Sequence, residues 1–318
     1  MSDLPKRVSI DEEGPREGIQ SEPAGIPLAD KVRLIEALAE TGLERIACVS
    51  YVNPKRVPQM ADAEDVAAAI RRKPGVGYSA LFLNLQGLER ALRGPLDVHG
   101  SLRITASDTF SRKNVGKSVD DALVEQRAWM PLFKANDVPV DWGIVLGAFG
   151  CNYEGDIPPA KIVARVGQLM DEAELLGLRL VGVKLTDAMG WATPARVEGA
   201  IGAIRERWPD LEISLHLHDT RGIGMASAYA GLRMGVTKFD ASIGGLGGCP
   251  FAATEGAAGN ICTEDLAFMC AEMGVETGLD LEALVECGRL AETVVRRPLP
   301  GHLMRGGTLT GARRRAAA

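Results

Sequence analysis

Apolar residues recur along this chain at two alternating spacings. A period of two residues is typical of β-strands, and a period of three to four is typical of amphipathic helices. Strand-like spacing covers residues 6–12, 43–50, 77–84, 98–106, 138–146, 178–186, 211–219 and 238–243. Helical spacing follows at residues 27–41, 61–71, around 88–92, in a segment that follows a polar loop (107–118) and ends near 136, and at 158–176, 193–207 and 225–234.

Eight strand-then-helix units predict a (β/α)8 barrel, the TIM-barrel class, in residues 1–278. The alternative is an open, doubly wound sheet, which the even spacing of the units disfavours. Residues 279–318 are predicted to add a C-terminal helix (279–295) and a disordered tail to the same domain. No Gly/Ser-rich linker divides the chain.

The composition is that of an ordinary globular protein, with 46% hydrophobic and 25% charged residues. The net charge of −6 argues against nucleic acid or an anionic membrane as partner. The six cysteines form no CxxC pair, which argues against a disulfide framework or a zinc knuckle. Without an apolar run long enough to span a membrane or a signal segment, we expect a cytoplasmic protein.

The seventh predicted strand, LEISLHLHDT (211–220), carries the clearest chemical signal. Period-two alternation sends Ile213, Leu215 and Leu217 to one face and Ser214, His216 and His218 to the other. Side chains on one face of a strand recur about every 6.5–7 Å, so one metal ion can reach both imidazoles. The alternative is a pair of hydrogen-bonded core histidines.

Other polar residues follow the ends of different strands, where a barrel gathers its catalytic groups. Arg16 and Glu17 follow the first strand, Asp187 the sixth, and Cys249 and Asn260 the eighth. Two imidazoles, a carboxylate and an amide oxygen suit Mg²⁺ or Mn²⁺ better than tetrahedral zinc. The alternative for Arg16 is a surface salt bridge.

Two further side chains stand out by their position. Cys249 lies in a glycine-rich loop, where a thiol can shuttle a proton; the alternatives are a buried structural cysteine or a phosphate-binding turn. Lys184 is predicted to face the barrel interior, where it could bind an anionic substrate or form a Schiff base. An ion pair with Asp11, Glu12 or Glu13 is its plainer explanation.

Several motifs in residues 7–285 resemble those of the hydroxymethylglutaryl-CoA lyases. GPREGIQSE is similar to the family's GPRDGLQNE, YVNPKRVPQM to SFVSPKWVPQM, and HLHDT to HCHDT. The glycine-rich segment IGGLGGCPFAATEGAAGNICTEDL is similar to AGLGGCPYAxGASGNxATEDL, which is long and specific.

The resemblance implies a homodimeric enzyme that cleaves a 3-hydroxyacyl-CoA by a retro-Claisen reaction, releasing acetyl-CoA and a keto acid. It implies a divalent metal, Mg²⁺ or Mn²⁺, held by Glu17, His216, His218 and Asn260. Arg16 would stabilise the enolate, Cys249 would transfer a proton, and Asp187 would handle the substrate hydroxyl. Gln20 and Lys184 are expected to contact the substrate.

The sequence departs from the family pattern at three positions. Glu17 replaces an aspartate, Ala47 replaces an acid, and Lys184 replaces a serine. Together, Ala47 and Lys184 make the cavity more positive by about two charges, which favours a carboxylated or longer-branched acyl-CoA. Two other functions stay open: a metal-independent aldolase with Lys184 as its Schiff base, and a non-catalytic binding protein in which Glu17 pairs with Lys184.

Overall fold

A computed structural model describes residues 4–248 and 258–316 of the chain. These residues form two compact units. The first holds residues 98–239 with residues 4–5, and the second holds residues 6–97, 240–248 and 258–316. Strand β10 (Lys238–Ala241) contributes residues to both units. Within the described residues, no helix combines the length and apolar character needed to cross a membrane.

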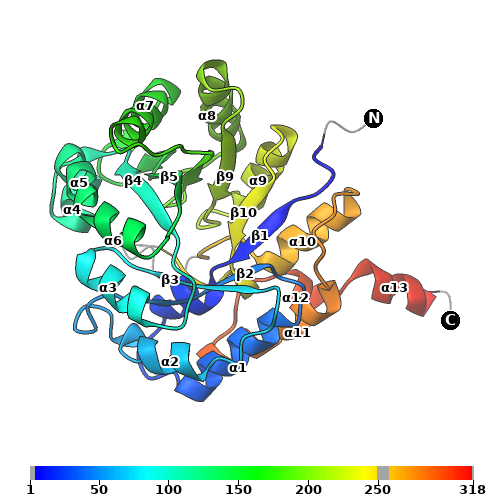
Figure 1. The fold of residues 1–318 in the computed structure, drawn as a ribbon. Coiled ribbons are helices and arrows are strands. Elements are labelled where there is room, and N and C mark those ends of the chain that lie inside the picture. Colours follow the sequence, from blue (N-terminus) through cyan, green and yellow to red (C-terminus); the bar gives the residue numbers. More distant parts are fainter. Residues whose placement is uncertain (1–3, 249–257, 317–318) are drawn as a thin grey trace. The chain divides into compact units, whose positions relative to one another are not determined.

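The first unit contains four parallel strands with helices between them. Hydrogen bonds join neighbouring strands in the order β4 (Gly100–Thr105), β5 (Val140–Leu146), β8 (Gly182–Thr186) and β9 (Glu212–His216). Helices α7 (Pro159–Leu175), α8 (Pro194–Arg207) and α9 (Gly224–Arg233) pack side by side (Figure 1). A hairpin of β6 (Gly150–Cys151) and β7 (Gly155–Asp156) follows β5.

Local sequence explains where the helices of this unit begin. The Thr193 side chain accepts a hydrogen bond from the Arg196 N–H, and Pro194 occupies the first turn of α8, where its missing N–H costs nothing. Residues 107–118, predicted to be a polar loop, instead contain helix α4 (Asp108–Val115). The helix predicted to follow that loop and end near residue 136 is three pieces: α5 (Val119–Glu125), η3 (Gln126–Trp129) and α6 (Met130–Ala135). Gly116 ends α4 in the left-handed conformation, with φ 75°, and Ser118 caps α5.

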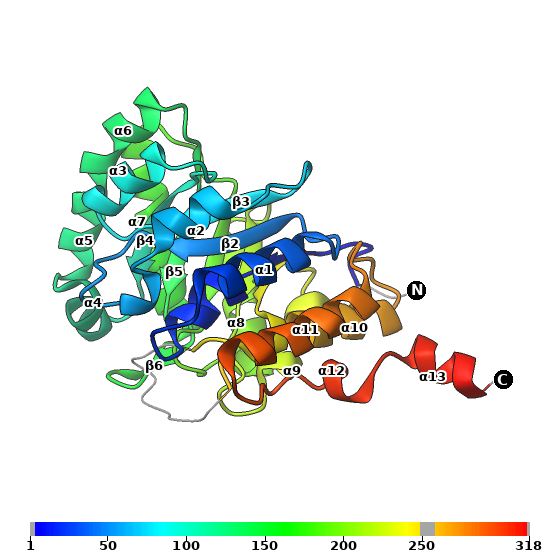
Figure 2. The same cartoon turned by 90° about the horizontal axis from the view of Figure 1, so that it is seen from below.

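The second unit contains three parallel strands, β1 (Ser9–Glu12), β2 (Arg45–Ser50) and β3 (Gly77–Leu81). Its helices are α1 (Leu28–Ala39), η2 (Pro58–Met60), α2 (Ala63–Ala69), α3 (Leu85–Arg93), η4 (Ile243–Gly245), α10 (Thr263–Glu272), α11 (Leu281–Val295), α12 (Leu303–Gly306) and α13 (Leu309–Ala316). Helices α1, α10 and α11 lie side by side (Figure 2).

Most of the predicted strands and helices of this unit are present, but they begin later or end earlier than the hydrophobic pattern predicts. The apolar stripe of α1 buries Leu34, Ile35 and Leu38, as its period predicts. Helix α11 matches the predicted C-terminal helix, and Asp280 caps it by accepting the N–H groups of Glu282 and Ala283. The hydrophobic pattern did not delimit α10.

Two glycines in the first unit make a matched pair for testing how tightly the helices pack. A Cβ on Gly231 of α9 would lie 2.5 Å from Cδ1 of Leu215 on β9, whereas a Cβ on Gly202 of α8 meets nothing within 4 Å. We expect Gly202→Ala to raise the free energy of unfolding by about 0.5–1 kcal/mol, because alanine stabilises a helix interior. Gly231→Ala should lower it by about 1–3 kcal/mol through overpacking.

Urea unfolding of the two variants and the wild type measures both changes. A stabilising effect at both positions would show that α9 has room to move away from β9.

Candidate functional site

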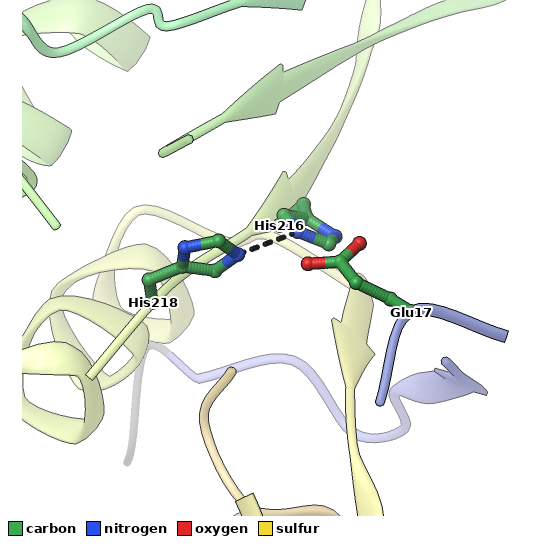
Figure 3. Close-up of side chains that lie close together, drawn as sticks. All are labelled: Glu17, His216 and His218. Atoms are coloured by element: carbon green, nitrogen blue, oxygen red, sulfur yellow. Dashed lines mark hydrogen bonds between the residues drawn. The ribbon is translucent and has the colours of Figure 1, made fainter. Parts of the chain in front are cut away.

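The two histidines of the predicted metal strand lie together at the end of β9, in the first unit. His216 is the last residue of the strand, and His218 follows two residues later. Their Nε2 atoms are 3.2 Å apart and both rings are buried (Figure 3, which also draws Glu17). Two imidazole nitrogens that face each other at this distance can share one proton or bind one cation.

Strand register brings Lys184 onto the histidine face of the same sheet. In the parallel pairing of β8 and β9, Lys184 is opposite Ser214 and Thr186 is opposite His216. Opposed residues of parallel strands point to the same side, and alternation keeps Ser214 and His216 on that side. Lys184 is half-buried between Val183 and Leu185, which are fully buried. Lys184 therefore shares a face of this sheet with Ser214 and His216.

Asp187 follows β8 and is fully buried. Its Oδ1 accepts the Trp191 N–H at 2.7 Å, and its Oδ2 accepts the Ala192 N–H at 2.9 Å. Burial raises the pKa of this carboxyl above its ordinary value, and the nearby His218 partly opposes that rise. The two backbone bonds fix the carboxyl group beside the histidine strand.

The second unit presents Arg16 and Glu17 on a short π-helix, η1 (Gly14–Gly18), directly after β1. The Glu13 carbonyl anchors this turn by accepting the N–H groups of Arg16, Glu17 and Gly18. Single π-turns of this kind concentrate at functional sites. The sequence motif indicated the residues but not this backbone conformation.

Arg16 lies between two carboxylates instead of on the surface. Its Nη2 donates to Oε2 of Glu13, and its Nη1 is 3.0 Å from Oε2 of Glu17. All three side chains are largely shielded from solvent, with 14%, 11% and 16% of their surface exposed for Arg16, Glu13 and Glu17. Burial alone would lower the pKa of Arg16, but attraction first to Glu13 and then to Glu17 raises it.

Asn260 lies next to Glu17. Its Nδ2 donates to Oε1 of Glu17 at 3.2 Å and to the Leu246 carbonyl at 3.1 Å. Its Oδ1 is buried and accepts no hydrogen bond from any residue that the structure describes. Because buried carbonyl oxygens are normally satisfied, Oδ1 is suited to bind a ligand atom such as a metal ion.

Close packing around Asn260 requires a glycine. A Cβ on Gly247 would lie 2.6 Å from Nδ2 of Asn260, and the backbone φ of +101° disfavours any other residue. This explains one glycine of the GGLGG segment as a packing requirement of the site.

Two buried carboxyl groups support these loops: Glu12, which the sequence suggested only as a possible ion-pair partner of Lys184, and Glu264, which the sequence did not single out. Glu12 accepts the N–H groups of Gly14 and Ile243 at 2.7 and 2.9 Å, and the Thr263 hydroxyl at 2.6 Å. Both oxygens of Glu264 accept the Gly244 N–H. Burial raises the pKa of Glu12 to about 7 and that of Glu264 to about 8. An acid on the last residue of a predicted strand was the available signal for Glu12.

Gln20 and Cys249 are the other two residues that the sequence predicts for the site. Gln20 lies in the helical turn that continues η1, where its Oε1 accepts a hydrogen bond from the Ser50 hydroxyl at the end of β2. Cys249 lies outside the described residues, so its predicted role in proton transfer stays a prediction.

Comparison with known proteins identifies similar sequences along nearly the whole chain. The HMGL-like family profile matches residues 7–291. A Bacillus subtilis protein named hydroxymethylglutaryl-CoA lyase YngG is 40% identical over 297 residues, which cover 93% of this chain and 96% of that protein. A Pseudomonas aeruginosa protein named 3-hydroxy-3-isohexenylglutaryl-CoA/hydroxymethylglutaryl-CoA lyase is 38% identical, covering 90% of this chain and 92% of that protein.

Similarity extends to solved structures. The crystal structure of the Bacillus subtilis HMG-CoA lyase matches with a TM-score of 0.86 at 38% identity, over 95% of this chain and 98% of that one. The predicted family and the (β/α)8 fold class are both confirmed.

The raised pKa values of Glu12 and Glu264 predict how stability depends on pH. Between the ordinary carboxyl value and the raised one, the folded protein holds protons that the unfolded chain has released. The free energy of unfolding should therefore fall by about 1.4 kcal/mol per pH unit for each group, from about pH 5 to about pH 7 for Glu12 and to about pH 8 for Glu264.

Melting temperatures measured with EDTA across this range check the trend. Glu264→Gln removes one titrating group while keeping an acceptor for Gly244, so its profile should be flatter than that of the wild type. An unchanged slope would mean that Glu264 is ionised throughout.

Proposed function

Because this chain belongs to the HMGL-like family, we propose that it is a divalent-metal-dependent carbon–carbon lyase that cleaves a 3-hydroxyacyl-CoA to acetyl-CoA and a keto acid. The predicted class of enzyme is confirmed by relatives named as hydroxymethylglutaryl-CoA lyases. The observation that carries the proposal is the buried histidine pair, with Nε2 atoms 3.2 Å apart, at the end of a strand in a chain of this family.

His216, His218, Glu17 and Asn260 are proposed to hold the metal. The first three offer two ring nitrogens and a carboxylate oxygen, which are donors for Mg²⁺ or Mn²⁺. The buried Oδ1 of Asn260, which accepts no hydrogen bond from the described residues, is suited to be the fourth. When bound, the metal supplies positive charge that polarises the substrate oxygens.

The remaining proposed roles concern proton and charge handling. Asp187 is held by two backbone N–H groups, and its raised pKa suits a group that takes the proton of the tertiary hydroxyl. Loss of that proton lets the C–C bond break, so that the keto acid leaves. Arg16 stabilises the acetyl-CoA enolate that forms, and Cys249 returns a proton to its carbon.

For the acyl group, we propose a carboxylated or longer-branched relative of hydroxymethylglutaryl-CoA. Support comes from Lys184, which shares the face of His216, and from the absence of an acid at Ala47 on β2. The name of the Pseudomonas aeruginosa relative includes a longer-branched substrate for that protein. We also propose a cytoplasmic homodimer, which size-exclusion chromatography and fractionation can test.

Metal removal should abolish activity. We expect EDTA to stop acetyl-CoA release from hydroxymethylglutaryl-CoA and its branched analogues, and Mn²⁺ or Mg²⁺ to restore it. His218→Ala should lower kcat/KM by about a hundredfold or more, because a Lewis acid contributes several kcal/mol to the transition state.

His302→Ala is the matched control, since His302 lies on the surface, with 85% of its side chain exposed. Activity that survives both EDTA and His218→Ala would contradict a metal-dependent lyase.

Lys184 can be tested with pairs of substrates that differ by one carboxylate. If Lys184 binds that carboxylate, Lys184→Ala should lower kcat/KM for the carboxylated substrate by about tenfold or more and leave the neutral analogue nearly unchanged. Lys238→Ala removes a surface lysine that pairs with Glu212 and serves as control.

Equal kcat/KM values for Lys184→Ala and wild type would contradict the assigned role. A borohydride-trapped keto-acid adduct on Lys184 would instead support a Schiff-base aldolase.

A further inference from the structure

The buried triad Glu13–Arg16–Glu17 contains one acid more than the proposed metal site needs. Glu17 is a proposed ligand, and Arg16 a proposed catalytic group. Glu13 is buried, and its carboxylate accepts the Nη2 donor of Arg16. This ion pair lies entirely within the second unit.

Glu13 is held firmly enough to position another side chain. Its N–H donates to the Ala241 carbonyl at 2.8 Å, and its own carbonyl anchors the π-helix through three N–H groups. The carboxylate comes from the residue before this hydrogen-bonded turn and the guanidinium from the middle of the turn, three residues later. Ion pairs to Glu13 and Glu17 hold the largely buried guanidinium of Arg16 in this orientation.

The charges of these groups explain why a second carboxylate beside Arg16 favours metal binding. A divalent ion on Glu17 would compete with Arg16 for the same carboxylate, and an uncompensated guanidinium 3.0 Å from that carboxylate would repel the ion. Glu13 offers Arg16 a second carboxylate. When Glu17 turns to a metal ion, Arg16 keeps a counter-charge and an orientation.

We propose that Glu13 is a positioning residue that acts through Arg16: it neutralises and orients the guanidinium so that Glu17 can bind the metal ion. This inference rests on the proposed metal-dependent function. It assigns to Glu13 a role that the motif of Arg16 and Glu17 does not include.

A double-mutant cycle on the full chain tests the inference, with Mn²⁺ alone as the probe in calorimetric titration. The four proteins are wild type, Glu13→Gln, Arg16→Gln and the double variant. Glu13→Gln should raise the Kd for Mn²⁺ about tenfold, because Arg16 then lacks the Glu13 counter-charge and competes with the ion for Glu17. In the Arg16→Gln background, Glu13→Gln should change the Kd for Mn²⁺ by less than about threefold, because no guanidinium remains for Glu13 to neutralise.

Each outcome has a defined meaning. An equal rise of Kd in both backgrounds would show that Glu13 acts on the ion directly, which overturns the inference. Binding by wild type with no effect of Glu13→Gln overturns the inference alone. Absence of Mn²⁺ binding by wild type overturns the proposed function together with it.

Two further proteins separate positioning from folding. Glu172→Gln removes a buried carboxylate from the Arg127–Glu172 pair of the first unit, and it should leave the Kd for Mn²⁺ unchanged whatever it does to the melting temperature. If Glu13→Gln does not fold, Glu13→Asp keeps the charge but withdraws it by one methylene. That variant should raise Kd by a smaller factor than tenfold, and an unchanged Kd would contradict the inference.

Discussion

The buried carboxylate of Glu12 is the interaction on which the second half of the candidate site depends. One oxygen accepts N–H groups from Gly14 and Ile243, and the other accepts the Thr263 hydroxyl. Gly14 begins the turn of Arg16 and Glu17, while Ile243 and Thr263 flank the segment that contains Asn260. Each donor left without a partner would cost about 1–3 kcal/mol, so one side chain fixes both loops together.

Glycine makes room for a second buried acid in the same unit. Both oxygens of Glu264 meet the Gly244 N–H, and a Cβ on Gly301 would lie only 2.4 Å from one of them. A Cβ on Gly288 would be 3.3 Å from the same atom. The abundance of glycine near the C-terminal half of the chain thus reflects, in part, the space that a buried carboxyl group needs.

The local parts of this architecture could be predicted, and the long-range parts could not. Hydrophobic period located the strands and most helices, and alternation along residues 211–219 put the two histidines on one face. Helix α4 was missed, and its residues were predicted to be a loop, because Ser107 and Gly116 define its ends through capping and backbone conformation, which a hydrophobic pattern does not contain. The role of Glu12 in joining the two loops was not predicted because two of its three partners are 231 and 251 residues away.

Asn260 illustrates the same limit at the level of a single atom. An asparagine side chain offers two donors and one acceptor, and the sequence does not tell which faces a ligand. Here Glu17 and the Leu246 carbonyl take the donors, so that the acceptor Oδ1 is left for a ligand. The orientation of Asn260 therefore depends on the negative charge of Glu17. Glu17 also pairs with Arg16, which in turn pairs with Glu13. Substitutions in this turn consequently affect the ligand atoms of Glu17 and Asn260 together. A glutamate at position 17, which is one methylene longer than aspartate, therefore requires neighbouring side chains that are placed to suit its length.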